Sequence, residues 1–201
     1  MGAGNPAVYW QTMNLLHRRY CRSDRWRRAV HRGMMPWVLR EVDLGANVLE
    51  IGPGPGVTTD WLRERVPALT CVEIDHQLAA SLGDRLSGTN ATVVEGDATQ
   101  TRFPGASFDS AVCFTMLHHV PSRQLQDRLL VEACRVLKPG GLFLGSDSTS
   151  SFRFRLFHLF DICVPVEPDG FPTRLEAAGF GEIEVAERPE YNTFKFRARK
   201  A

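Results

Sequence analysis

Three glycines at alternate positions follow an apolar run in the stretch VLEIGPGPG, residues 48–56. The apolar run predicts a buried strand, and glycine lets the backbone turn tightly because it has no Cβ atom. The next segment, residues 57–65, predicts a helix. A strand that enters a helix through a glycine loop begins a βαβ unit. This stretch therefore restricts the chain to the α/β class.

The same alternation of strand and helix continues along the chain. Further strands are predicted at residues 69–74, 92–95, 108–114 and 142–146, and helices at 76–86, 122–137 and 172–179. Pro139-Gly140-Gly141 predicts a turn before the fifth strand, and residues 182–188 and 191–199 alternate like antiparallel closing strands. We therefore predict an α/β fold with a doubly wound, mostly parallel seven-stranded sheet.

The glycine loop is a candidate ligand site, because ligands bind at the carboxyl ends of strands in open α/β sheets. A dinucleotide fingerprint needs glycine at position 57, where this chain has valine, and a phosphate-binding loop needs a lysine that Val57-Thr58 does not supply. The observed spacing, E-x-G-x-G-x-G from Glu50 to Gly56, resembles the first motif of class I S-adenosylmethionine-dependent methyltransferases.

Three further motifs strengthen this resemblance. Glu73 lies 23 residues after Glu50, the run Glu95-Gly96-Asp97-Ala98 follows the third strand, and residues 108–120 continue toward RVLKPGG at residues 135–141. Together the motifs cover residues 46–147. The resemblance implies a Rossmann-like methyltransferase fold, with S-adenosylmethionine as cofactor and S-adenosylhomocysteine as product.

The resemblance also implies which residues bind the cofactor. Glu73 is expected on the ribose hydroxyls, since a carboxylate there can accept two hydrogen bonds, and Asp97 and Ala98 match the adenine positions. Asp75 is instead predicted to cap the next helix. The full set is Glu50, Gly52, Pro53, Gly54, Gly56, Glu73, Ile74, Asp97, Ala98 and Thr115.

The methyl acceptor is less constrained by sequence. Residues 71–75 resemble rRNA adenine dimethylases, but base-modifying enzymes resemble each other in an Asn/Asp-Pro-Pro/Leu-Tyr/Phe motif after the fourth strand, where this chain has TMLHH at residues 115–119. We therefore expect methyl transfer to oxygen, nitrogen or carbon of a small, lipophilic metabolite. The alternatives are RNA or ribosome modification and a non-catalytic cofactor-binding module.

His118 and His119 follow the fourth strand, at the carboxyl edge of the predicted sheet. A neutral imidazole there could remove a proton from the acceptor as the methyl group transfers. We take His119 and His118 as the catalytic candidates. The alternative is that both only pack and hydrogen-bond at the start of a helix.

Residues 1–44 are predicted to form an N-terminal helical arm before a cofactor-binding domain at residues 45–201. The arm helices are expected from Asn5-Pro6 to about Tyr20, from Ser23 until Gly33 stops the helix, and from Pro36. Residues 1–40 hold eight arginines and one acidic residue, although the whole chain has a net charge of +1. The arm could dock on the acidic domain or face nucleic acid, an anionic membrane or an anionic substrate.

Residues 148–170 are predicted as a lid insert that, with the arm, covers an apolar acceptor pocket. Within it, several apolar side chains would share one helical face. They are Phe152, Leu156, Leu159, Phe160 and Cys163. The alternatives are core packing, a dimer interface and peripheral contact with a membrane.

The five cysteines form no CxxC pair, and their odd number suits a reducing, cytoplasmic compartment. Cys71 and Cys113 are expected as core thiols. No metal site is expected, because no histidine or cysteine ligands cluster along the sequence. No apolar run approaches the length of a transmembrane helix, and the N-terminus lacks the pattern of a secretory signal.

Overall fold

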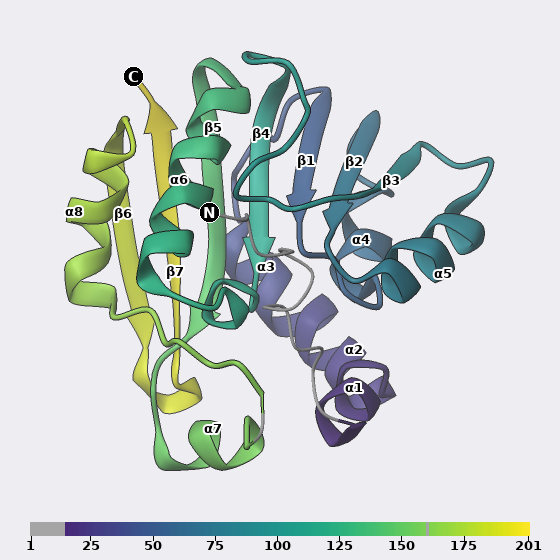
Figure 1. Ribbon diagram of the computed structural model, residues 1–201, viewed down its shortest axis with the longest axis vertical. Helices are drawn as coiled ribbons and strands as arrows, with labels where there is room; N and C mark the ends of the chain where they lie inside the picture. Colours follow the sequence, from purple (N-terminus) through teal and green to yellow (C-terminus); the bar gives the residue numbers. More distant parts are fainter. Residues whose placement is uncertain (1–14, 160) are drawn as a thin grey trace, which may run out of the picture.

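The computed structural model describes residues 15–159 and 161–201 and contains one seven-stranded sheet in the order β3-β2-β1-β4-β5-β7-β6 (Figure 1). The strands are β1 (Asn47–Ile51), β2 (Ala68–Glu73), β3 (Ala91–Glu95), β4 (Phe108–Phe114), β5 (Leu137–Ser148), β6 (Phe180–Arg188) and β7 (Thr193–Lys200). The helices are α1 (Leu15–Cys21), α2 (Asp24–Ala29), α3 (Met35–Val38), α4 (Val57–Leu62), α5 (His76–Leu86), α6 (Arg123–Val136), α7 (Phe152–Phe157) and α8 (Phe171–Ala177). Shorter helical turns are η2 (Val30–Met34), η3 (Leu117–His119), η4 (Pro168–Gly170) and η5 (Pro189–Tyr191).

The predicted doubly wound, mostly parallel sheet is confirmed. β1 pairs in parallel with β2 and β4, and the parallel pairing extends to β3 and β5. The prediction that both last segments are antiparallel is wrong for one of them. β7 is antiparallel to both β5 and β6, so β6 runs in the same direction as β5. The helix α8 between β5 and β6 makes that connection a crossover, and only the hairpin into β7 reverses the chain.

The Pro-Gly-Gly segment before the fifth strand is not a separate turn. It lies within β5, where the register against β4 shifts between Phe108 and Ser110 and Gly140 has φ +74°. Between the pairs Phe108–Leu137 and Ser110–Leu142, β5 has three more residues than β4, and the left-handed Gly140 lies in this bulge. The strand is therefore longer than the apolar run that predicted it.

Alternate positions on the strands build two core layers. On β1, Leu49 and Ile51 belong to the layer that includes α6 and α8, whereas Val48 belongs to the layer that includes α3, α4 and α5. Helices thus cover both faces of the sheet (Figure 1). The predicted core thiols, Cys71 and Cys113, are confirmed as buried in these layers.

Gly33 does not stop the second arm helix, contrary to the prediction. The chain continues through the π-helical turn η2 into α3, with Pro36 in the first turn of α3, where a missing N–H is tolerated. Val30 and Met35 are fully buried against the sheet, and this packing offsets the helix cost of glycine, about 1 kcal/mol. The predicted helix start at Asn5-Pro6 lies outside the described residues.

The lid insert forms a short helix rather than a long one. α7 covers Phe152–Phe157, and apolar side chains in it and just after it are exposed: Phe152 is 82% exposed, Leu156 56% and Leu159 50%. Core packing is therefore the wrong explanation for these side chains. Phe160 lies outside the described residues. Among the described helices, none combines the length and hydropathy needed to cross a membrane.

The carboxyl ends of the parallel strands share one edge of the sheet, and α1, α2 and α7 gather beyond that edge (Figure 1). The division of the chain at residue 44 into arm and domain stays a prediction. Val38 and Leu39, at the end of the arm, share a core layer with Val48 of β1 and Leu144 of β5.

Gly145→Ala should destabilise the protein at the centre of the sheet. Gly145 pairs with Cys113 on β4, and a Cβ atom there would overlap the Cys113 carbonyl, which is backbone and cannot rotate away. We expect urea unfolding to show a loss of about 1–3 kcal/mol or more. Gly33→Ala is the control, since its Cβ would meet open space in a helical segment; equal unfolding free energies for the two variants would contradict the packing described here.

Candidate functional site

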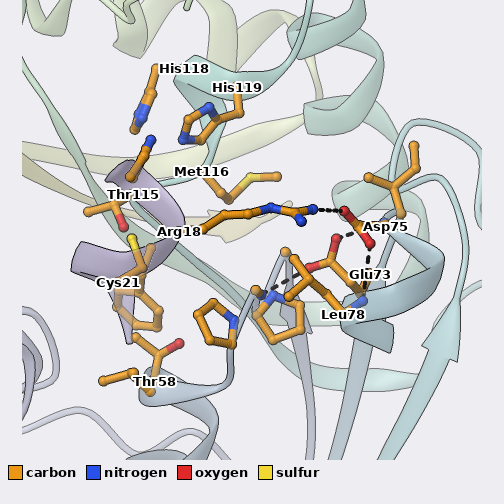
Figure 2. A pocket seen from close by; sticks show the side chains of 18 of the residues that line it. Arg18, Cys21, Thr58, Glu73, Asp75, Leu78, Thr115, Met116, His118 and His119 are labelled. Carbon is orange, nitrogen blue, oxygen red and sulfur yellow. Dashed lines mark hydrogen bonds and ion pairs between the residues drawn. The ribbon is translucent and has the colours of Figure 1, made fainter. Parts of the chain in front are cut away.

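A cavity of about 760 Å³ lies at the carboxyl edge of the sheet, within the range of roughly 300–1,000 Å³ that is usual for small-molecule sites. Most of the predicted site residues contribute to its wall. They are Gly52, Pro53, Gly54, Glu73, Ile74, Ala98, Thr115, His118 and His119. Figure 2 shows the histidine pair and Glu73 in different parts of this one cavity.

The glycine loop after β1 has left-handed backbone where the chain turns. Gly52 and Gly54 have φ +65° and +55°, and a Cβ at Gly52 would crowd Met116. Gly56 lies outside the wall as the N-cap of α4, where a Cβ would overlap Leu82 and Arg85. It lets the start of α4 pack closely against α5, and its assignment to the cofactor stays a prediction.

Glu50 lies beneath the loop rather than in the cavity wall, and its contact with the cofactor stays a prediction. Its fully buried carboxylate accepts hydrogen bonds from the hydroxyls of Thr58 (2.5 Å) and Thr59 (2.6 Å) at the start of α4. Burial raises the pKa of Glu50, and these two hydroxyls oppose that rise. Glu50 therefore joins α4 to β1 and holds the loop from below.

Glu73 ends β2 and is only 6% exposed. Its two carboxylate oxygens accept from the backbone N–H groups of Gly54 and Asp75, each at 2.9 Å. Burial raises the pKa of Glu73, and the two N–H donors oppose the rise. A carboxylate offers about four acceptor sites, so this one can still accept hydrogen bonds from a ligand's hydroxyl groups.

Asp75 caps α5 as predicted, through Oδ1, which accepts from the N–H groups of Gln77 and Leu78. Its other oxygen accepts from Arg18 Nη2 at 2.7 Å. Figure 2 shows Arg18 reaching across the cavity from α1 to this carboxylate. Sequence analysis did not identify Arg18, because no motif distinguishes it from the other arm arginines.

Asp97 is not part of the cavity wall, and its assignment to adenine stays a prediction. Its Oδ1 accepts from the Thr99 N–H at 2.8 Å, so the side chain stabilises the turn after β3. Its neighbours Gly96 and Ala98 line the cavity in its place. A short polar side chain in a turn commonly bonds to backbone two residues ahead.

His118 forms a buried dyad with Asp147, near the end of β5. Its Nδ1 hydrogen-bonds to Asp147 Oδ1, and its backbone N–H donates to Asp147 Oδ2 at 3.1 Å. An ionised carboxylate only accepts, so Nδ1 carries the proton and Nε2 presents a lone pair. Among the described residues Nε2 has no hydrogen-bond partner, although the ring lines the cavity. Asp147, an acidic residue near the end of the fifth strand, is the signal in the sequence that could have revealed this dyad.

Thr115 follows β4 with φ +50°, a left-handed conformation that is uncommon for a non-glycine residue. Its N–H donates to Ser146 O on β5 at 2.8 Å, which fixes the turn. The chain then enters η3, which brings His118 and His119 to the cavity.

Four histidines meet beside this turn: His17, His118, His119 and His158. Nitrogens of three of them, His17, His119 and His158, lie within 4.8 Å of one another. The structure therefore holds a cluster of possible metal ligands that the spacing along the sequence does not show. The three are far apart in sequence and come together only in the folded chain.

These histidine side chains favour the neutral form. Burial lowers the pKa of His17 to about 4, against its hydrogen bond to Asp161. Burial, reinforced by the neighbouring histidines, lowers the pKa of His119 well below its usual value. Burial also lowers the pKa of His158. Neutral imidazoles can accept protons or bind metal ions.

Comparison with known proteins identifies the type of domain. A family model described as a methyltransferase domain matches residues 49–145. The chain is 34% identical over 135 residues to ribosomal RNA small subunit methyltransferase A of Aromatoleum aromaticum, which covers 59% of this chain and 51% of that protein. The chain thus spans about half the length of this curated relative.

Solved structures share the fold. A SAM-dependent methyltransferase from Aquifex aeolicus has a TM-score of 0.74 at 19% identity, over 94% of this chain and 100% of that chain. Phosphoethanolamine N-methyltransferase 2 of Haemonchus contortus, solved with phosphomonomethylethanolamine and S-adenosylhomocysteine, has a TM-score of 0.71 at 17% identity, over 85% of this chain and 52% of that chain. The predicted Rossmann-like methyltransferase fold is confirmed.

Replacing His17 by Gln should make stability less dependent on pH. Between pH 6.5 and about 4 the unfolded chain protonates His17 while the folded chain does not, so the free energy of unfolding falls as the pH falls. Removing this imidazole should reduce the slope of the unfolding free energy against pH by up to about 1.4 kcal/mol per pH unit in that window. Urea unfolding with a chelator present measures it.

His76→Gln is the control for this experiment. His76 is exposed, and its hydrogen bond to Glu95 raises its pKa, so its contribution has the opposite sign. An unchanged slope in the His17 variant would contradict the burial of a neutral imidazole at this position.

Proposed function

This chain belongs to the class I S-adenosylmethionine-dependent methyltransferases, and we propose that it methylates an oxygen, nitrogen or carbon of a small, lipophilic acceptor. The observation that carries the proposal is one continuous cavity that joins the glycine loop and Glu73 to the His118–Asp147 dyad. Such a cavity can hold a cofactor at one end and an acceptor at the other.

We assign the cofactor to the end of the cavity that contains Gly52, Gly54 and Glu73. The missing Cβ atoms allow the methionine part of S-adenosylmethionine to approach the loop backbone. Glu73, already held by two backbone N–H groups, accepts from the ribose hydroxyls. Ala98 and the backbone around it lie beside the adenine. Glu50 acts from below by holding the loop.

We assign the acceptor to the end with the histidines. When bound, S-adenosylmethionine would supply the methyl group of its sulfonium to the acceptor's oxygen, nitrogen or carbon and would remain as S-adenosylhomocysteine. His118 Nε2 takes the proton of the acceptor's hydroxyl or amine. Asp147 is a positioning residue that fixes the tautomer and stabilises the imidazolium that forms.

The lipophilic character of the acceptor follows from the lid insert. Phe154 of α7 lines the cavity, while Phe152 and Leu156 of the same helix remain exposed. Apolar side chains on both the cavity side and the outer side of α7 suit an acceptor with an apolar body that approaches over this helix.

Ribosomal RNA modification is the second candidate, because the curated relative named above is a ribosomal RNA methyltransferase. The arm also exposes arginines that could contact phosphates. They are Arg19, Arg22, Arg25, Arg28 and Arg32. Against this candidate stand residues 115–119, which lack the motif that holds a base amine.

The experiment that separates the two candidates measures S-adenosylhomocysteine production. The chain is supplied with S-adenosylmethionine and either a lipophilic metabolite extract or ribosomal subunits. Turnover with the extract supports the proposal. Turnover on subunits alone, with affinity that falls steeply as salt rises, assigns the chain to RNA instead. No turnover with either overturns both.

Glu73→Ala should weaken binding of S-adenosylhomocysteine. Hydrogen bonds to a charged group contribute about 1.5–3 kcal/mol, so the dissociation constant should rise roughly ten- to hundredfold. Calorimetry measures it, with Glu64→Ala, a change at an exposed carboxylate, as the control. An unchanged constant would reject the ribose assignment, and tight NAD binding by the unmodified protein would reject the cofactor site.

His118→Gln should slow methyl transfer without weakening the cofactor. Loss of a general base costs about 10²–10⁴-fold in rate, so kcat should fall while the dissociation constant of S-adenosylhomocysteine stays unchanged. Asp147→Asn should also lower kcat and shift its pH profile, because the carboxylate sets the tautomer and basicity of His118. An unchanged kcat in His118→Gln would show that transfer needs no base from this dyad.

A further inference from the structure

We propose that His17, His119 and His158 bind one zinc-type divalent metal ion at the acceptor end of the cavity. One imidazole nitrogen from each residue lies within 4.8 Å of the others, and all three side chains line the cavity. They come from α1, η3 and the segment after α7. The site is therefore assembled from three separate parts of the chain.

Each of the three rings has its Nδ1 directed at a protein oxygen. His17 Nδ1 lies 3.1 Å from the Asp161 carboxylate, His158 Nδ1 lies 2.8 Å from the Phe154 carbonyl, and His119 Nδ1 lies 3.4 Å from the Ile162 carbonyl. Metal-binding histidines almost always donate the second ring N–H to a carboxylate or carbonyl. This arrangement directs Nε2 of each ring to the metal.

The donor set suits zinc. Three imidazoles form a known zinc ligand set, with a fourth position left for water or substrate. His118 stays outside the set, because the three ring nitrogens that lie within 4.8 Å of one another are those of His17, His119 and His158.

Binding would draw the three segments together. Zinc–nitrogen bonds of about 2.0–2.1 Å in tetrahedral geometry place ligand atoms roughly 3.3 Å apart, closer than the present 4.8 Å limit. The closure joins α1 to the segment after α7 over the acceptor end. The fourth position faces the cavity, where an acceptor oxygen or nitrogen could take it; this last step rests on the proposed methyl transfer.

The test uses the full chain, treated with a chelator, dialysed and titrated with Zn²⁺ by calorimetry and with Co²⁺ by visible absorption. We expect one equivalent to bind, with the absorption of a tetrahedral Co²⁺ site. His17→Ala, His119→Ala and His158→Ala should each weaken binding more than tenfold. The control is His76→Ala, at an exposed histidine, and it should match the unmodified protein.

Asp161→Asn is a more conservative variant, because it leaves all three histidine ligands in place. Loss of such a partner typically costs 10–100-fold in metal affinity, so an intermediate weakening is expected even where a histidine variant fails to fold. No stoichiometric binding by the unmodified chain, or equal binding by the folded histidine variants and the control, overturns the metal site.

S-adenosylhomocysteine affinity and turnover are measured on the same samples. Metal binding without methyl transfer would overturn the proposed function alone. Methyl transfer without metal binding would overturn the metal site alone.

Discussion

The cavity depends on the buried carboxylate of Glu73, which joins the two loops around it. One oxygen accepts from Gly54 in the loop after β1, and the other accepts from Asp75 at the start of α5. Glu50 holds the same glycine loop from below through Thr58 and Thr59. Burying two carboxylates is costly unless hydrogen bonds satisfy them. The backbone donors and hydroxyls do this, so the loop geometry and carboxylate burial stabilise each other.

Sequence periodicity predicted the parallel half of the fold well, because buried strands and amphipathic helices have strong local patterns. The helix predicted at residues 76–86 has the bounds of α5. Alternation reports which side chains are buried but not the direction of a strand, so β6 was misassigned. Glycines that usually mark a helix end or a turn also gave wrong predictions where tertiary packing determines the backbone. Gly33 lies within a continuous helical segment, and Gly140 lies in a bulge of β5.

The site was predictable where a motif fixes the backbone, as at Gly52, Gly54 and Glu73, whose positions follow from the strand ends. Asp97 shows the limit, since the sequence does not reveal that its Oδ1 accepts a hydrogen bond from the Thr99 N–H in the turn after β3. Arg18 and the histidine cluster could not be predicted, because only the packed chain brings such distant residues together. These residues are recognised by their buried polar side chains, and burial of a polar group cannot be inferred from the sequence.

The histidine cluster is also where the fold departs from what stability alone favours. Four imidazoles lie close together, burial disfavours the charged form of His17, His119 and His158, and the Nε2 atom of His118 is buried without a hydrogen-bond partner among the described residues. A buried polar atom left in this way typically costs about 1–3 kcal/mol. Apolar side chains of similar size would fill the space with less penalty. Departures of this kind concentrate at functional sites, and this one lines the cavity beyond the glycine loop, where an acceptor would meet the cofactor's methyl group.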